Sequence, residues 1–227
     1  MKNMRKRIGF ALILAVALLS AFGLTACSGP KVGSGKAYTE KHLKGDYSIT
    51  YKFTVTATEN GKKETESYIH TYERTDEGYH VRYQSGVDAA FAGWMYRKNS
   101  SGTYDLYVGN SDSVYTKVQS YDPVSEEVAK NYNLGINYMT FYGDTSGMKA
   151  NSTQRIAGRV CVRYKQSVNI PFVMKVGYDY AIDKKTGVCM KYAFSVSVKG
   201  GGESGDYGVA FICTEFKTKD VTLPSVS

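Results

Sequence analysis

The sequence predicts a mostly antiparallel α+β domain with about ten strands and one or two short helices, forming a single unit over residues 37–227. Apolar and polar residues alternate over long stretches, which is the period of a half-buried strand. Asn-Gly and Gly-rich connections separate these stretches. The 20 tyrosines, and the 23 glycines beside only 4 prolines, also favour strands joined by glycine turns.

The first 26 residues are predicted to be an export signal that is removed from the mature protein. Four bases precede residue 8, and residues 8–19 form an apolar run without a charge. Because a spanning helix needs about 20 apolar residues, this shorter run is typical of a signal peptide. It is followed by Leu24, Thr25, Ala26 and Cys27, which resemble the lipobox of bacterial lipoproteins.

The lipobox resemblance implies that Cys27 is acylated on its sulfur and becomes the amino terminus. Two or three acyl chains would hold the protein on a membrane, since each buried CH₂ contributes about 0.8 kcal/mol. Residues 27–36, which are rich in Gly, Ser and Lys, are then the acylated cysteine and a flexible tether. We expect a lipoprotein anchored to the bacterial cell membrane and facing outside the cytoplasm. The alternative is an ordinary secretory signal in which Cys27 is incidental.

Two hairpins are predicted to begin the domain. Residues 47–57 place aromatic and aliphatic side chains at odd positions and Thr, Ser or Lys at even positions. Asn60-Gly61 predicts a type I′ turn into a strand over residues 64–74. That turn sets Tyr68 opposite Phe53, His70 opposite Tyr51 and Tyr72 opposite Ile49. A second turn leads to a strand over residues 79–83 that continues the aromatic face.

Three shorter strands and a helix are predicted next. The strands are residues 94–98, 104–108 and 114–119, separated by polar loops. Asp122-Pro123 is typical of the N-cap and first residue of a helix, with Glu126 and Glu127 in its first turn and Leu134-Gly135 at its end. Val128, Ala129 and Tyr132 are expected to face the sheet.

The carboxyl half repeats the strand pattern with even positions inward. The predicted strands are residues 160–164, 176–182 and 188–198, and a Gly-rich turn then opens a last strand over residues 207–217. Within this half, residues 157–164, 178–191 and 214–217 resemble the carboxyl half of LolA-like bacterial lipoproteins. The resemblance implies a curved half-barrel sheet around an apolar cavity, and several members of that family carry lipid or acyl chains. It brings no catalytic residue.

Charge and motifs argue against nucleic-acid binding and catalysis. The net charge of +8 falls to 25 bases against 21 acids once residues 1–26 are removed, and no basic block follows. Residues 202–206 lack the closing Gly of G-x-S-x-G, and residues 143–147 lack its central Ser. His42, His70 and His80 have no metal-ligand spacing, and no Gly-rich phosphate loop opens a helix. We therefore expect no enzyme, no metal site and no cofactor.

The aromatic face holds the candidate binding residues. His70 is the one polar group that the register places among aromatic rings, either as a core histidine bonded to a tyrosine hydroxyl or as a polar contact at the mouth of a ligand cavity. Tyrosine excess suits lipid or carbohydrate binding, although strand propensity explains it equally well. The predicted cavity-lining residues are Tyr51, Phe53, His70, Tyr72, Tyr83, Tyr178, Tyr180, Tyr192 and Phe194.

Three cysteines remain besides Cys27. Cys161 and Cys189 fall on the outward phase of their strands, two strand spacings apart. At about 9–10 Å that separation exceeds the limit of about 7 Å between the Cα atoms of a disulfide, so a simple meander disfavours this bridge. A sharper twist or a different strand order would permit it. Cys213 reaches Cys189 only if the last hairpin is shifted from its simplest register.

Two functions are compatible with these patterns. The first is a membrane-anchored lipoprotein that binds a lipid or another hydrophobic or amphipathic molecule in a half-barrel cavity. The second is a structural or sensory lipoprotein that binds a partner protein, of unknown identity, through its sheet edge or outer face.

Overall fold

The computed structural model describes residues 43–59, 61–85, 93–111, 114–132, 149–171, 173–200 and 203–226. The predicted signal peptide, Cys27, the tether and the helix end at Leu134-Gly135 lie outside these residues. No helix within the described ranges is long and apolar enough to cross a membrane.

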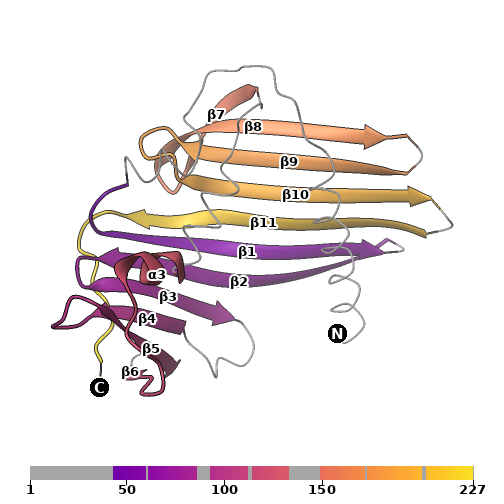
Figure 1. Ribbon diagram of the computed structural model, residues 1–227. Coiled ribbons are helices and arrows are strands. Elements are labelled where there is room, and N and C mark those ends of the chain that lie inside the picture. The colour runs from indigo at the N-terminus through magenta and orange to yellow at the C-terminus, as the bar shows by residue number, and fades with distance from the viewer. Residues whose placement is uncertain are drawn as a thin grey trace.

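The described strands all belong to one open, mostly antiparallel sheet, which confirms the predicted fold class of a curved half-barrel (Figure 1). The strands are β1 Tyr47–Glu59, β2 Lys62–Thr75, β3 Gly78–Ser85, β4 Gly93–Lys98, β5 Tyr104–Ser111, β6 Val114–Lys117, β7 Ala150–Ile156, β8 Arg159–Ile170, β9 Met174–Asp183, β10 Cys189–Gly200 and β11 Glu203–Lys217. The helix described is α3, Glu126–Tyr132. The sheet order is β6-β5-β4-β3-β2-β1-β11-β10-β9-β8-β7.

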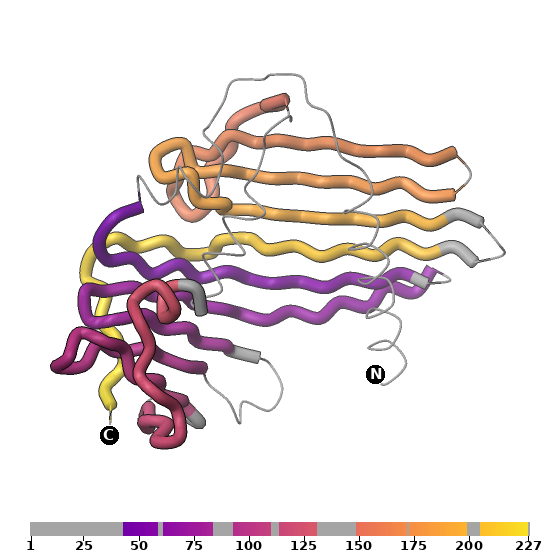
Figure 2. The backbone as a smooth tube through the Cα atoms, in the orientation of Figure 1, coloured from indigo at the N-terminus to yellow at the C-terminus, as the bar shows by residue number. Residues whose placement is uncertain are grey.

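Two meanders meet in the middle of the sheet. Strands β1 to β6 run outward to one edge, and strands β7 to β11 run inward from the other edge. The first and last strands therefore pair, from Ser48↔Lys217 to Glu59↔Gly205. Figure 2 shows the indigo β1 lying beside the yellow β11. This pairing of distant parts of the chain creates one continuous surface from two local units.

The register of the first hairpin is as predicted. Phe53 pairs with Tyr68, Tyr51 with His70 and Ile49 with Tyr72. The turn at Gly61 has a φ of 75°, which a glycine adopts without strain. The next hairpin sets His70 opposite Tyr83, so the aromatic face continues onto β3.

The helix begins later than the sequence predicts. Its first turn is capped by Ser125, whose Oγ accepts a hydrogen bond of 3.4 Å from the Val128 N–H. The prediction of Asp122-Pro123 as N-cap and first residue is therefore wrong. The reason is that Val124 instead exchanges two backbone hydrogen bonds with Tyr104, which keeps this stretch extended.

The helix packs on the aromatic face of the sheet, as expected for Ala129. Ala129 is fully buried against Tyr79, Tyr96 and Tyr104. Val128 is half-buried. The side chain of Tyr132 lies outside the described part of the chain. Strands β3 to β6 curl toward the side on which α3 lies (Figure 1).

The outward phase predicted for Cys161 and Cys189 does not leave them at the surface. Both are buried, as is Cys213, and all three thiols are free. A register shift between Cys189 and Lys191 turns Cys189 toward the aromatic face, and Cys161 is covered because both phases of β8 and β9 are buried at this end. Val160, predicted inward, is exposed because it lies beyond the last β8 residue that pairs with β9.

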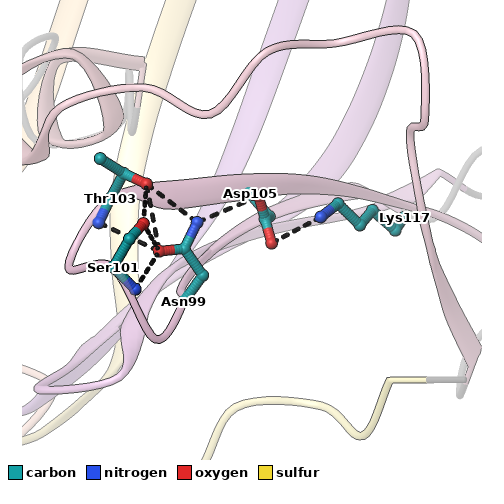
Figure 3. A network of polar contacts seen from close by, with 5 residues as sticks. All are labelled: Asn99, Ser101, Thr103, Asp105 and Lys117. Atoms are coloured by element: carbon teal, nitrogen blue, oxygen red, sulfur yellow. Dashed lines mark hydrogen bonds and ion pairs between the residues drawn. The ribbon is translucent and has the colours of Figure 1, made fainter.

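A polar network fixes the turn between β4 and β5 (Figure 3). The Asn99 Oδ1 atom accepts hydrogen bonds from the backbone N–H groups of Ser101 and Thr103. Its amide nitrogen donates to Asp105, which in turn pairs with Lys117 of β6 at 2.8 Å. The network therefore ties β6 to the turn that precedes β5.

Candidate functional site

One row of aromatic side chains crosses six adjacent strands on the face that carries α3. Strand pairing places these residues side by side, one each from β2, β1, β11, β10, β9 and β8: Tyr68, Phe53, Phe211, Tyr192, Tyr180 and Tyr164. Neighbouring ring centroids lie 4.6 Å apart for Phe53 and Phe211 and 5.2 Å apart for Tyr180 and Tyr192. We call this set the aromatic row.

The face becomes progressively more open from one side of this row to the other. On the side of the β9–β10 turn, Tyr51 and Ile49 are each 1% exposed and belong to the main core. On the opposite side, away from the β9–β10 turn, the next residues across the sheet are Val55, Val209, Phe194 and Tyr178, all half-buried. Beyond them lie Val196, Val176 and Val168, also half-buried. We call the region from the aromatic row to these valines the apolar face.

The predicted cavity-lining residues thus share one face but differ in exposure. Tyr51, Tyr72, Tyr180 and Tyr192 are buried, whereas Phe53, His70, Tyr83, Tyr178 and Phe194 are half-buried. The first group contributes mainly to the core, and the second group presents ring surface. That these residues line a ligand cavity stays a prediction.

Tyr51 is a core residue whose hydroxyl is fixed. It donates a buried hydrogen bond of 3.0 Å to the Cys189 carbonyl, which reaches from β1 across β11 to β10. Burial, followed by the nearby Cys213 and Cys189 thiols, raises the pKa of Tyr51 well above its ordinary value. Tyr51 therefore braces the sheet and stays protonated.

His70 is held among rings, as the sequence predicted. Its ring centroid lies 4.5 Å from that of Tyr83 in an edge-to-face arrangement, and its Nδ1 lies 3.3 Å from the Tyr72 hydroxyl. Burial lowers the pKa of His70, so the imidazole is neutral at neutral pH. A neutral imidazole is compatible with an apolar ligand.

The residues that the sequence did not bring into the site are Tyr68, Phe211 and Tyr164. A signal existed for Phe211, because a two-residue turn at Gly201-Gly202 sets it opposite Tyr192, as the structure has it. Tyr164 is 1% exposed, and its buried hydroxyl has no hydrogen-bond partner among the described residues. An unsatisfied buried hydroxyl costs about 1–3 kcal/mol.

The opposite face of the sheet carries ion pairs instead of rings. Arg163 and Lys191 both bind Asp179, with N–O distances of 2.7 and 2.6 Å. Burial opposes ionisation of Asp179, but these two cations hold the pKa of its carboxyl below the usual range. The two faces therefore differ in chemistry, with one apolar and one charged.

A second polar cluster lies near the sheet edge at β6. His80 is 1% exposed, with Nδ1 2.8 Å from Glu73 and Nε2 2.6 Å from the Tyr115 hydroxyl. Burial opposes ionisation of Glu73, but hydrogen bonds from His80 and Ser48 outweigh it and hold its pKa below the usual range. The cluster is enclosed, and its hydrogen bonds link β3 to β2 and to β6.

The three cysteine thiols are also enclosed. Burial is the main cause that raises the pKa of Cys161 to about 11 and of Cys189 and Cys213 to about 12. Thiols with such pKa values are poor nucleophiles at neutral pH. Among the described residues, no group of three or more His, Cys, Asp or Glu side chains is placed to hold a metal ion.

Comparison with known proteins gives similar structures but no family. No family model and no curated protein matches the sequence. Pseudomonas aeruginosa MucB in its complex with MucA is similar at a TM-score of 0.31 and 13% identity, with 84% of this chain and 59% of that chain covered. This chain therefore spans less than two thirds of the MucB chain.

Two further structures cover most of both chains. A LolA superfamily protein from Nitrosomonas europaea has a TM-score of 0.28 and 11% identity, with 84% of this chain and 96% of that chain covered. A putative outer membrane lipoprotein-sorting protein domain from Vibrio parahaemolyticus has a TM-score of 0.25 and 10% identity, covering 83% of this chain and 94% of that chain. Similarity at this level assigns no function, which has to be argued from the site itself.

Proposed function

We propose that the protein is a lipid-anchored, extracytoplasmic binding protein that holds a hydrophobic or amphipathic molecule against its apolar face. The observation that carries this proposal is the set of half-buried rings and valines that continues across β1, β11, β10 and β9. Contiguous apolar surface of this kind is typical of sites for ligands, partners or membranes. The opposite face carries ion pairs on β8 to β10, and its exposed Ile69 and Ile212 lie on either side of Lys52.

The composition of the face suits an amphipathic molecule. Phe53, Phe194 and Phe211 offer ring area without a polar atom, whereas Tyr178 adds a hydroxyl that hydrogen-bonds. A molecule with an apolar body and a polar group would meet both kinds of side chain.

We propose binding without catalysis. The Cys189 and Cys213 thiols and the Tyr51 hydroxyl have pKa values above their ordinary range because they are buried, so they stay protonated and are poor nucleophiles at neutral pH. His80 is enclosed between Glu73 and Tyr115. Catalysis needs a reactive group that a substrate can reach.

A charge placed on the apolar face tests the binding proposal. Val196 and Ser195 are neighbours on β10 that point to opposite faces, so Val196→Glu and Ser195→Glu form a matched pair. We expect Val196→Glu to weaken binding of a fluorescent fatty acid at least tenfold, because a carboxylate must be desolvated when the ligand covers it. Fluorescence titration measures the affinity, and circular dichroism confirms that both variants are folded.

Ser195→Glu is expected to bind like the unmodified protein. Equal weakening by both variants would show that the lost affinity does not depend on the apolar face. Full affinity in Val196→Glu would place the ligand elsewhere.

Acylation of Cys27 is tested separately. Cys27→Ala leaves no thiol to acylate, so we expect the precursor to retain residues 1–26 and to incorporate no labelled fatty acid. Metabolic labelling and the intact mass measure both effects. If Cys27→Ala still takes up the label, or the unmodified protein is released with an unacylated amino terminus, residues 1–26 are an ordinary secretory signal.

A second candidate function is binding of a partner protein through the sheet edge or outer face. The observation that favours it is a stretch of β8 that extends past its neighbour β7, and it concerns a different surface from the apolar face.

A further inference from the structure

Strand β8 is longer than the edge strand that covers it. Its pairing with β7 ends at Tyr164, whereas its pairing with β9 continues from Lys165↔Asp179 to Ile170↔Met174. Residues 165–170 therefore have a strand on one side, and on the other side no described strand pairs with them. We call these six residues the β8 overhang.

The hydrogen-bond pattern shows which backbone groups face outward. The Lys165 N–H donates to the side-chain Oδ1 of Asn151, at the point where the register of β7 shifts. This N–H therefore points toward the β7 side. Because alternate residues of an antiparallel strand direct their backbone groups the same way, Ser167 and Asn169 also present their N–H and C=O groups to this edge.

The side chains of the β8 overhang alternate between the two faces. Gln166, Val168 and Ile170 are half-buried on the apolar face, and Lys165, Ser167 and Asn169 are exposed on the other. An added strand would thus set every second side chain against Val168 and Ile170. Its remaining side chains would lie on the face that carries Lys165.

Two lysines beside the β8 overhang favour an acidic strand as its partner. Lys165 and Lys175 are exposed on the outer face of β8 and β9, and neither has a carboxylate partner within the described ranges. Acidic side chains on an added strand would pair with them, whereas basic ones would be repelled.

A second stretch of strand without a described neighbour is protected, unlike the β8 overhang. The last described pair between β2 and β3 is Tyr68↔Ser85, so residues 62–67 of β2 have no described partner on that side. There Glu64 and Glu66 lie on the apolar face, opposite Ala57 and Val55. Inward-pointing charges disfavour the docking of another strand. The β8 overhang has Val168 and Ile170 at the corresponding places.

We propose that the β8 overhang docks an extended segment of a partner protein by antiparallel strand pairing, and that this segment alternates apolar with acidic residues. The Ser167 and Asn169 backbone groups supply the affinity, and Lys165 with Lys175 selects the acidic pattern. This inference concerns the partner-binding function and is independent of ligand binding on the apolar face.

The test uses the full-length acylated protein in detergent micelles and a fluorescent peptide of four Val-Glu repeats. Ser167→Pro removes an N–H that faces the open edge, and a proline at such a position keeps the pairing with β9. Ser167→Ala is the matched control because it keeps the N–H. We expect Ser167→Pro to weaken binding of the Val-Glu peptide at least tenfold and Ser167→Ala to change it less than twofold. A peptide of Val-Lys repeats tests the charge, and we expect it to bind only to Lys165→Glu.

Hydrogen exchange identifies the occupant of the edge. We expect the Ser167 and Asn169 amides to exchange rapidly in the free protein and slowly with the peptide. Slow exchange in the free protein would show that another part of this chain occupies the edge, and a dimer that Ser167→Pro dissociates would show a second copy. Either result, or equal peptide binding by Ser167→Pro and the unmodified protein, overturns the proposal. Fatty-acid binding by Ser167→Pro reports separately on the apolar face.

Discussion

Replacing Gly78 with alanine is expected to destabilise the domain by more than about 3 kcal/mol. Gly78 has a φ of 155°, which side-chain-bearing residues rarely adopt. A Cβ built there would lie 2.0 Å from the Tyr96 carbonyl oxygen and 3.0 Å from the Arg97 Cα. Both atoms belong to the backbone of β4, so relief requires β3 and β4 to separate.

The same substitution at Gly93 and at Gly45 provides the comparison for the stability loss expected of Gly78→Ala. Gly93→Ala should cost a similar amount, because its φ is 152° and its Cβ would lie 2.0 Å from the Val81 carbonyl oxygen. Gly45 has a φ of 79° and open space around it, so Gly45→Ala should cost about 1–2 kcal/mol. Urea denaturation of the three variants measures the differences in the free energy of unfolding. Equal values for Gly78→Ala and Gly45→Ala would contradict the close approach of β3 and β4.

Asp183→Ala is expected to cost about 3–5 kcal/mol, the loss typical of breaking a buried ion pair. The Asp183 carboxylate is 2% exposed in its side chain and pairs with the Arg159 guanidinium through two hydrogen bonds. It also accepts hydrogen bonds from the N–H and hydroxyl of Thr186, which close the turn into β10. Removing the carboxylate leaves a partly buried cation and an unpaired N–H.

Asp179→Ala is the matched control. Asp179 binds two cations, Arg163 and Lys191, but its side chain is 15% exposed against 2% for Asp183. Ion pairs that water reaches contribute less to stability than enclosed ones, so Asp179→Ala should cost less than Asp183→Ala. Both values come from denaturant unfolding at neutral pH. Equal losses of stability in the two variants would show that the burial of Asp183 adds nothing to the cost of removing its carboxylate.

Local patterns predicted the hairpins well. Asn60-Gly61 and the alternation before it were sufficient to set Phe53 opposite Tyr68, because turn type fixes register. Strand β7 was missed, since Asn151, Ser152 and Thr153 show no alternation of apolar and polar residues. Strand β7 forms because it pairs with β8, and the periodicity of its own sequence does not reveal that pairing.

Features that depend on distant contacts could not be predicted. The helix start moved because Val124 pairs with Tyr104, and Cys189 turned inward because of a β-bulge. The candidate site followed from strand phase, so its residues share one face. The exposure of each residue depends on the pairing of β1 with β11 and on packing across the sheet. Tyr51, for example, is buried, whereas Phe194 is half-buried.

Native mass spectrometry shows whether the apolar face carries a hydrophobic or amphipathic molecule. Residues 37–227, exported from bacterial cells behind an ordinary cleavable signal, avoid the protein's own acyl chains. We predict that this protein is recovered with a bound hydrophobic molecule after gentle purification, and that Ser195→Glu retains it while Val196→Glu loses it. Recovery of only the bare mass from the unmodified protein, together with no uptake of added fatty acid, would contradict the account.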